Sequence, residues 1–268
     1  GILPDLLICR TEKPMAYDIR RKIALFCNVP VRGVIEEKDV DFSIYEVPIV
    51  LHREGLDELI LAHFGAEYSR PDLSAWEAML DGLRHPQHQT EVAVVGKYTE
   101  LTDAYKSIYE SLTHAGIANR AKVSVRKVRS EDVESQGAEA LLANVRAILV
   151  PGGFGDRGIE GKIEAIRYAR ENRIPFLGIC LGMQCACVEF ARNVAGCAEA
   201  HSTEFAPATP HPVIALLEEQ VGVVDKGGTM RLGAFPCQLQ PGTRAREAYA
   251  ADAVRERHRH RYEFNNAY

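Results

Sequence analysis

A cysteine between two glycines is the strongest candidate for chemistry in this sequence. Cys180 lies in Gly178-Ile179-Cys180-Leu181-Gly182, after the apolar run Ile174–Ile179 and before the apolar helical stretch Leu181–Arg192. Small residues two positions before and after a nucleophile allow the strained turn that lifts its side chain above a sheet. Unpaired N–H groups at a helix N-terminus favour a thiolate over a thiol. A lone cysteine is usually a packing residue, but these neighbours predict a nucleophile.

A glycine-rich loop follows an earlier predicted strand. Pro151-Gly152-Gly153-Phe154-Gly155 comes directly after the apolar run Ala147–Val150. Ligands of open parallel sheets bind at the carboxyl ends of the strands, so this loop should neighbour Cys180. Glycines let a backbone N–H approach a developing oxyanion. The loop lacks the Gly-Lys-Ser/Thr of a phosphate-binding loop, so it predicts an oxyanion hole rather than a nucleotide site.

Strands and helices alternate around these two motifs. Apolar runs predict strands at 92–95, 123–128, 147–150 and 174–179. Helical patterns cover 103–115, 138–144, 159–172 and 181–192. This alternation predicts an α/β fold with a doubly wound, mostly parallel sheet. The tail alternates polar and apolar residues in Gly227–Gln240 and Arg255–Phe264, which is typical of hairpins.

The first part of the chain has a different pattern. Its short, strand-like apolar runs are Ile2–Cys9, Lys22–Cys27 and Val31–Ile35, and a helical stretch, Lys13–Arg21, lies between the first two. Two amphipathic stretches follow, Gly55–Phe64 and Leu73–Leu83. The polar stretch Arg84–Thr90 has no hydrophobic period and predicts a domain boundary. We therefore expect one domain over residues 1–84 and a second over residues 91–268.

Composition excludes several classes of protein. The 268 residues are 46% apolar and 26% charged, with a net charge of −5, so no general basic patch predicts nucleic-acid binding. No apolar run approaches the ~20 residues of a membrane span, and the first residues do not resemble a signal peptide. Seven cysteines form an odd set without the spacing of a disulfide scaffold, which predicts reduced thiols and a cytoplasmic protein.

The two motifs together resemble the class I (triad) glutamine amidotransferases. Longer strings resemble the branch of this family that aminates UTP to CTP with ATP and glutamine. These strings are VGKYTELTDAYKS (95–107), HSTEF (201–205), GGTMRLG (227–233), RHRHRYE (257–263), KIALFCNVP (22–30) and KDVD (38–41). The resemblance implies that residues 1–84 are the tail of an α/β amidoligase (synthase) domain with linker helices. It also implies that residues 91–268 are the glutaminase domain.

The resemblance implies roles for individual residues of the glutaminase site. Cys180 would form a thioester with glutamine and release ammonia, while the N–H groups of Gly153 and Leu181 hold the oxyanion. The residues implied to contact glutamine are Gln184, Glu204 for its α-amino group, Arg261 for its α-carboxylate, and Phe154 on the loop. Opposite charges at a fixed separation suit a zwitterion. Without the resemblance, Glu204 is a solvated loop residue and Arg261 one of many strand charges.

The resemblance also implies nucleotide contacts in the first domain. Lys22 matches a contact to a pyrimidine-nucleotide phosphate, and Lys38, Asp39 and Val40 match residues lining an ATP site. The implied cofactors of the parent enzyme are ATP and Mg²⁺, with the Mg²⁺ ligands and the remaining synthase domain outside this sequence. GTP as an allosteric activator and a homotetramer are further expectations from the family.

The sequence departs from the family at the catalytic triad. The family places a His-Pro-Glu motif well downstream of RHRHRYE, and the sequence ends at Tyr268. His211-Pro212-Val213 is no substitute, because it precedes GGTMRLG and lacks the glutamate. We therefore expect the base and its orienting carboxylate to be missing from residues 91–268, and the chain alone to be inactive or incomplete. The segment Glu218–Lys226 is also short for the family.

Some of these residues allow other interpretations. Cys180, Cys185 and Cys187 could suggest a metal site, but an apolar helix favours core packing, and we expect no metal site in this chain. His258 and His260 alternate with arginines, so a strand would be basic on one face only, which disfavours polyanion binding. The alternative functions are another class I glutaminase, or a non-catalytic regulatory or assembly module with the same fold.

Overall fold

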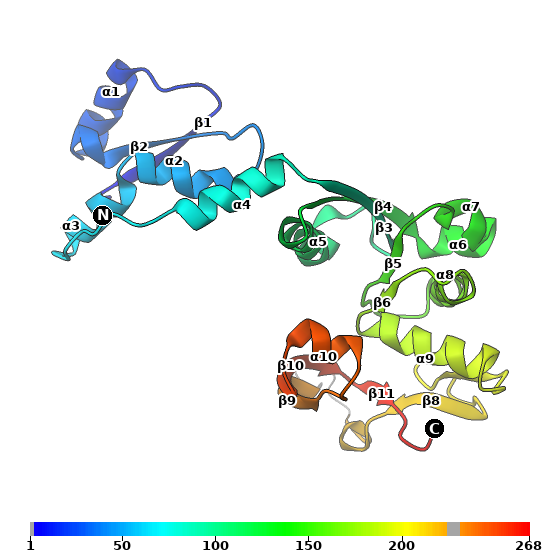
Figure 1. Cartoon of the computed structure of the whole chain (residues 1–268). Coiled ribbons are helices and arrows are strands. Elements are labelled where there is room, and N and C mark those ends of the chain that lie inside the picture. Colours follow the sequence, from blue (N-terminus) through cyan, green and yellow to red (C-terminus); the bar gives the residue numbers. More distant parts are fainter. Residues whose placement is uncertain (1–2, 224–230) are drawn as a thin grey trace. The chain divides into compact units, whose positions relative to one another are not determined.

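The computed structural model describes residues 3–223 and 231–268 (Figure 1). The chain divides into two compact units, Gly1–Pro86 and Gln87–Tyr268. The division falls inside the polar stretch 84–90, although His88–Thr90 already belong to the first strand of the second unit. Most of the GGTMRLG string and residues 224–226 of the short segment lie outside the described residues.

From residue 3 on, the first unit contains one pair of parallel strands and four α-helices. Its elements are β1 (Leu7–Thr11), α1 (Tyr17–Cys27), η1 (Val31–Gly33), β2 (Val34–Lys38), η2 (Ile44–Glu46), α2 (Val47–Arg53), α3 (Leu56–His63) and α4 (Ser74–Arg84). Strands β1 and β2 pair in parallel from Leu7↔Val34 to Thr11↔Lys38. Helices α3 and α4 coincide with the two predicted amphipathic stretches to within a residue or two.

The strand-like interpretation of Lys22–Cys27 is wrong, because this segment is the second half of α1. Ala24 is buried and Ile23 and Cys27 pack beside it, whereas Leu25 and Phe26 are 79% and 77% exposed. Buried positions at i, i+1 and i+4 belong to a helical stripe, while a half-buried strand buries alternate residues. The apolar run concealed this period because its exposed positions are also apolar.

The second unit is built on a four-stranded parallel sheet, which confirms the predicted α/β fold. Its strand order is β4 (Ala121–Arg129), β3 (His88–Gly96), β5 (Ala147–Val150) and β6 (Phe176–Gly178). The helices between and after these strands are α5 (Lys106–Ala118), α6 (Ser130–Gln136), α7 (Ala138–Leu142), α8 (Ile159–Glu171) and α9 (Leu181–Asn193), with η3 at Thr102–Tyr105. Helix α6 was not predicted.

The sheet carries apolar cores on both faces. Ala93 and Val95 of β3 face the larger core, which includes residues of α8 and α9. Val92 and Val94 face a smaller core formed with η3 and α5. Since successive strand residues point to opposite faces, a strand buried on both sides is a continuous apolar run. This is the physical basis of the predicted doubly wound sheet.

The remaining strands form two smaller sheets, and two short helices lie between them in the sequence. In chain order these elements are β7 (Ala200–Ser202), β8 (His211–Leu216), η4 (Glu218–Gln220), β9 (Arg231–Gln238), α10 (Arg244–Tyr249), β10 (Ala253–His260) and β11 (Tyr262–Phe264). Strands β9 and β10 pair antiparallel, as predicted for the tail, and β11, β8 and β7 form a three-stranded sheet. Along β10 the histidines are half-buried and the arginines exposed, so the predicted alternation of faces is confirmed.

Two general properties accompany this fold. No helix among the described residues is long and apolar enough to cross a membrane. All seven cysteines are free thiols.

Candidate active site

Cys180 occupies a strained corner between β6 and α9. Its backbone has φ 56° and ψ −114°, in the positive-φ region that side-chain-bearing residues rarely adopt, and it caps the N-terminus of α9. A Cβ on Gly178 would lie 2.6 Å from the backbone of Gly182, and one on Gly182 would lie 2.0 Å from the carbonyl oxygen of Val150. Only glycine fits at both positions, so the flanking glycines build the corner that presents the thiol. This corner, residues 178–182, is called the elbow below.

The glycine-rich loop after β5 lies against the thiol. A Cβ on Gly152 would lie 3.1 Å from Cβ and 3.4 Å from Sγ of Cys180. A Cβ on Gly153 would lie 3.7 Å from Cδ2 of Leu181. The sheet therefore brings together the loop and the first turn of α9, the two segments that carry the predicted oxyanion donors.

One narrow pocket gathers every residue predicted to handle glutamine. It is lined by Gly153, Phe154, Cys180, Leu181, Gln184, Glu204, Arg259, His260, Arg261 and Tyr262. Buried Gln184 donates from Nε2 to the carbonyl oxygen of Tyr262 at 2.7 Å, which ties α9 to β11. Arg261 lies in the bend between β10 and β11, not within a strand, and donates from Nη1 to Oε1 of Gln220 at 2.7 Å.

The two charged groups of this pocket come from distant parts of the sequence. Glu204 follows β7, and Arg261 follows β10. Partial burial raises the pKa of the Glu204 carboxyl, which the surrounding protein desolvates on the pocket side. A carboxyl in such a position gains from a cationic ligand group, because the cation offsets the cost of its desolvation.

His260 is the functional candidate that the sequence reasoning missed. The imidazole lines the same pocket as Cys180, and its Nδ1 lies 2.9 Å from Oε1 of Glu263. Hydrogen bonding to the Cys180 side chain, followed by hydrogen bonding to Glu263, raises the pKa of His260 to about 9 despite its partial burial. At neutral pH the residue is therefore an imidazolium. The only sequence signal is the spacing His260-Arg261-Tyr262-Glu263, which overlaps the predicted strand with one basic face.

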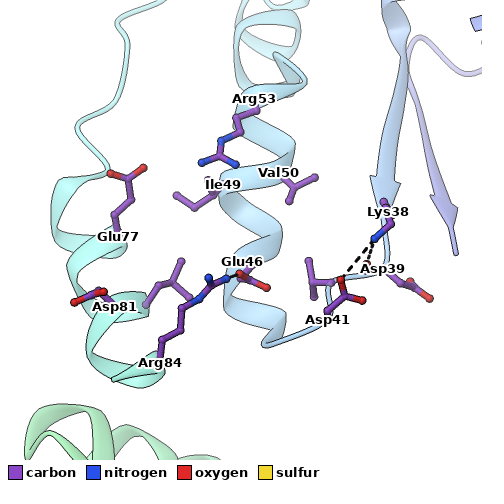
Figure 2. A pocket seen from close by; sticks show the side chains of 12 residues that line it. Lys38, Asp39, Asp41, Glu46, Ile49, Val50, Arg53, Glu77, Asp81 and Arg84 are labelled. Atoms are coloured by element: carbon purple, nitrogen blue, oxygen red, sulfur yellow. Dashed lines mark hydrogen bonds and ion pairs between the residues drawn. The ribbon is translucent and has the colours of Figure 1, made fainter. Parts of the chain in front are cut away.

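A second cavity lies within the first unit (Figure 2). Its volume is about 670 Å³, and charged side chains from the end of β2, from α2 and from α4 surround it. The lining residues include Lys38, Asp39 and Val40, the three predicted to line an ATP site. Lys22 is exposed on α1 and is not among the lining residues, so the cavity brings together three of the four predicted nucleotide contacts.

Several charged side chains of this cavity have ion-pair partners, some within the lining and some outside it. Lys38 Nζ lies 3.9 Å from the carboxylate of Asp41, and the carboxylate of Asp39 accepts a hydrogen bond at 2.6 Å from Arg10. Among the described residues no group of three or more His, Cys, Asp or Glu side chains is placed to hold a metal ion.

Comparison with known proteins identifies relatives of both units. The family model "Glutamine amidotransferase class-I" matches residues 100–268, and the model "CTP synthase N-terminus" matches residues 1–66. The CTP synthases of Caldanaerobacter subterraneus subsp. tengcongensis and Synechococcus sp. (strain JA-3-3Ab) are each 55% identical over the whole chain, which covers 50% and 49% of them. The chain thus spans about half the length of these curated relatives.

A solved structure resembles part of the chain. It is described as "Trypanosoma brucei CTPS - glutaminase domain with bound acivicin", and it is 37% identical with a TM-score of 0.61. The match covers 67% of this chain and 69% of that structure. The chain is therefore similar in both fold and sequence to a structure that is described as a glutaminase domain.

Proposed function

The chain belongs to the class I glutamine amidotransferase family, and we propose that its second unit releases ammonia from glutamine at Cys180. One observation carries the proposal: the elbow cysteine shares a pocket with Glu204 and Arg261, an anion and a cation suited to an amino acid. The glycine loop supplies backbone groups beside the thiol. These three features are what covalent attack on a carboxamide requires.

The reaction begins with attack of the Cys180 thiolate on the carboxamide carbon of glutamine. The new C–S bond displaces the C=O π pair onto oxygen, and the N–H groups of Gly153 and Leu181 hold the resulting oxyanion. Collapse of this intermediate re-forms the C=O bond and breaks the C–N bond, with a proton delivered to the departing nitrogen. Ammonia leaves, and water then hydrolyses the thioester to glutamate.

His260 is suited to support the first half of this sequence. An imidazolium beside the Cys180 sulfur can donate its proton to the departing ammonia. Glu263 holds Nδ1 and stabilises the charged ring. The chain therefore contains a Cys–His–Glu constellation of its own. In the family, by contrast, the resemblance assigns these roles to a His-Pro-Glu motif downstream of RHRHRYE, which this sequence does not include.

Recognition of glutamine follows from the charges around the thiol. Glu204 would accept hydrogen bonds from the α-ammonium group, and Arg261 would bind the α-carboxylate. Gln184, fixed by its bond to Tyr262, closes the side of the pocket formed by α9. We expect Phe154, which is 61% exposed on the loop, to cover the bound amino acid.

The parent activity that fits both units is the synthesis of CTP. ATP would phosphorylate the 4-oxygen of UTP, and ammonia from Cys180 would displace that phosphate. The cavity lined by Lys38, Asp39 and Val40 would contribute to the ATP site, and Lys22 would contact a pyrimidine-nucleotide phosphate. Activation by GTP, a dependence on Mg²⁺ bound elsewhere, a tetrameric assembly and a cytoplasmic location belong to the same proposal.

Replacement of the nucleophile in an enzyme that contains both complete domains tests this proposal. Cys180→Ser should abolish CTP formation from glutamine and leave formation from added ammonia largely intact, because amination needs only ammonia. Equal loss of both activities would show that Cys180 is structural. In the 268-residue chain, acivicin should label Cys180, and free glutamine should slow the labelling. A non-catalytic module would show no such protection.

A further inference from the structure

A buried lysine beneath the glycine-rich loop has no role in the chemistry above. Lys162 of α8 is 0% exposed, and its Nζ has no hydrogen-bond partner among the described residues. Burial of an unpaired amino group is costly, and the desolvation lowers the pKa of Lys162. A residue that weakens the fold in this way requires an explanation.

The amino group lies directly behind the predicted oxyanion donors. A Cβ on Gly153 would lie 3.7 Å from Nζ of Lys162, and equally 3.7 Å from Cδ2 of Leu181. The preceding residue, Gly152, is the one whose Cβ would meet the Cys180 sulfur at 3.4 Å. Gly152 thus lies beside the thiol and Gly153 beside the lysine, so this short piece of backbone separates the two side chains.

The surrounding charges leave the lysine poorly compensated. Burial raises the pKa of Cys185 to about 12, so this neighbour stays a neutral thiol. Glu131 favours the ammonium form, but its Oε1 lies 3.2 Å from Nε of Arg157. The positive charges of Lys97 and Arg157 lower the pKa of Lys162 further, because they repel its ammonium form. Among the residues that the structure describes, therefore, the Lys162 amino group has no anion of its own in the resting site.

We propose that Lys162 is a positioning residue that supports the oxyanion hole from behind the Gly152–Gly153 loop. The inference rests on the proposed glutaminase chemistry. When the thiolate adds to the carbonyl carbon, negative charge moves from sulfur to the carbonyl oxygen beside Gly153. The ammonium group then gains the counter-charge that it lacks at rest. An interaction that is stronger in the transition state than in the ground state accelerates the step.

The test compares two reagents on Cys180 in the 268-residue chain. A chloromethyl ketone analogue of glutamine first forms a tetrahedral adduct, with an oxyanion, before sulfur displaces chloride. Iodoacetamide reacts by direct displacement of iodide and forms no oxyanion. Lys162→Met, which keeps the length and removes the charge, should slow the ketone reaction about 10- to 100-fold, less than the ~100- to 1,000-fold lost with a direct oxyanion donor, because the lysine acts through the loop. Its iodoacetamide reaction should stay within about twofold of wild type.

Thermal unfolding supplies a readout that separates function from structure. Removal of a buried, unpartnered charge should leave the melting temperature of Lys162→Met unchanged or raise it. The matched control is Ile163→Met, a substitution at a buried neighbour in α8 that retains the charge; it should react with both reagents as wild type does. Lys162→Gln, which stays polar and neutral, repeats the measurement if the methionine variant does not fold.

Three outcomes would overturn the inference. One is a ketone reaction of Lys162→Met within about twofold of wild type. The second is equal slowing with both reagents together with a lower melting temperature, which is the signature of a structural lysine. The third is a ketone that labels Cys180 neither in the wild-type chain nor in an enzyme that contains both complete domains, and this result alone also overturns the proposed glutaminase function.

Discussion

The carboxylate of Glu263 lies 2.9 Å from Nδ1 of His260, and the same imidazole interacts with the Cys180 side chain. A carboxylate on one nitrogen fixes the orientation of the ring and favours its charged form. The three side chains come from the elbow and from two adjoining strands near the end of the chain. We therefore expect the reactivity of Cys180 to depend on His260, a residue 80 positions away in the sequence.

The first prediction tests this dependence. His260→Gln should slow alkylation of Cys180 by iodoacetamide at pH 7 by about tenfold or more, since the thiolate loses its charged neighbour. Glu263→Gln should slow it less, because the imidazole remains. The matched control is His258→Gln, on the same face of β10, whose Nδ1 contacts the carbonyl oxygen of Glu256. Equal effects of the two histidine substitutions would contradict the assignment.

A second prediction concerns the pH dependence of stability. The pKa of His260 is about 9 in the folded chain, above the ordinary 6.5, so its protonation stabilises the fold. The contribution is fully present below pH ~6.5 and is lost as the pH rises through about 9. We expect it to be on the order of 1–2 kcal/mol, reduced by screening of the partly exposed ring.

Urea unfolding of wild type and His260→Gln at several pH values measures this contribution. The difference in free energy of unfolding between the two proteins should shrink between pH 6.5 and 9.5. A difference that stays constant or grows across this interval would show that the imidazolium does not stabilise the fold.

The third prediction tests the packing of the elbow. Gly182→Ala should destabilise the second unit by about 3 kcal/mol or more, because the new Cβ would meet the Val150 carbonyl oxygen at 2.0 Å and neither backbone can move freely. Gly153→Ala is the control, since its Cβ would make only ordinary contacts at 3.7 Å. Denaturant unfolding should give a near-wild-type free energy for the control, and similar losses for both variants would contradict the steric argument.

The fourth prediction ranks the seven thiols. A glutamine-shaped electrophile at pH ~7 should label Cys180 first, and free glutamine should slow that reaction. Cys185 should react last, because its pKa is raised to about 12, and burial also raises the pKa of Cys187. Peptide mapping checks the order. Faster labelling of Cys197 or Cys237, or indifference of Cys180 to glutamine, would count against the nucleophile.

Much of the second unit is predictable from local pattern. Strand β5 and helices α8 and α9 match their predicted bounds to within one residue. A strand buried on both faces is an uninterrupted apolar run, and a buried helix has a stripe of period 3.6, so each leaves a signal in adjacent residues. The elbow is predictable for a similar reason. Its tight contacts involve Gly178 and Gly182, each two positions from Cys180, together with Val150 at the end of β5.

The first unit shows where local pattern fails. Exposed apolar residues such as Leu25 and Phe26 make the end of α1 resemble a strand, and only the packing of Ala24 identifies the buried stripe. Helix α2 left no usable signal because it spans only seven residues. In both cases the contacts that select the structure come from other elements rather than from neighbours in sequence.

The parallel α/β architecture, the strained corner that carries Cys180 and the glycine-rich loop beside it could all be predicted from the sequence, because each depends on residues close together in the chain. Two features emerge only from the folded chain: His260 and Glu263 approach Cys180, and Lys162 lies behind Gly153 without a hydrogen-bond partner among the described residues. Glu204 and Arg261 were assigned by resemblance, and the fold brought them to the pocket. Charged residues on loops and helices carry no periodic signal, since their environment is set by elements that meet only when the sheet has formed.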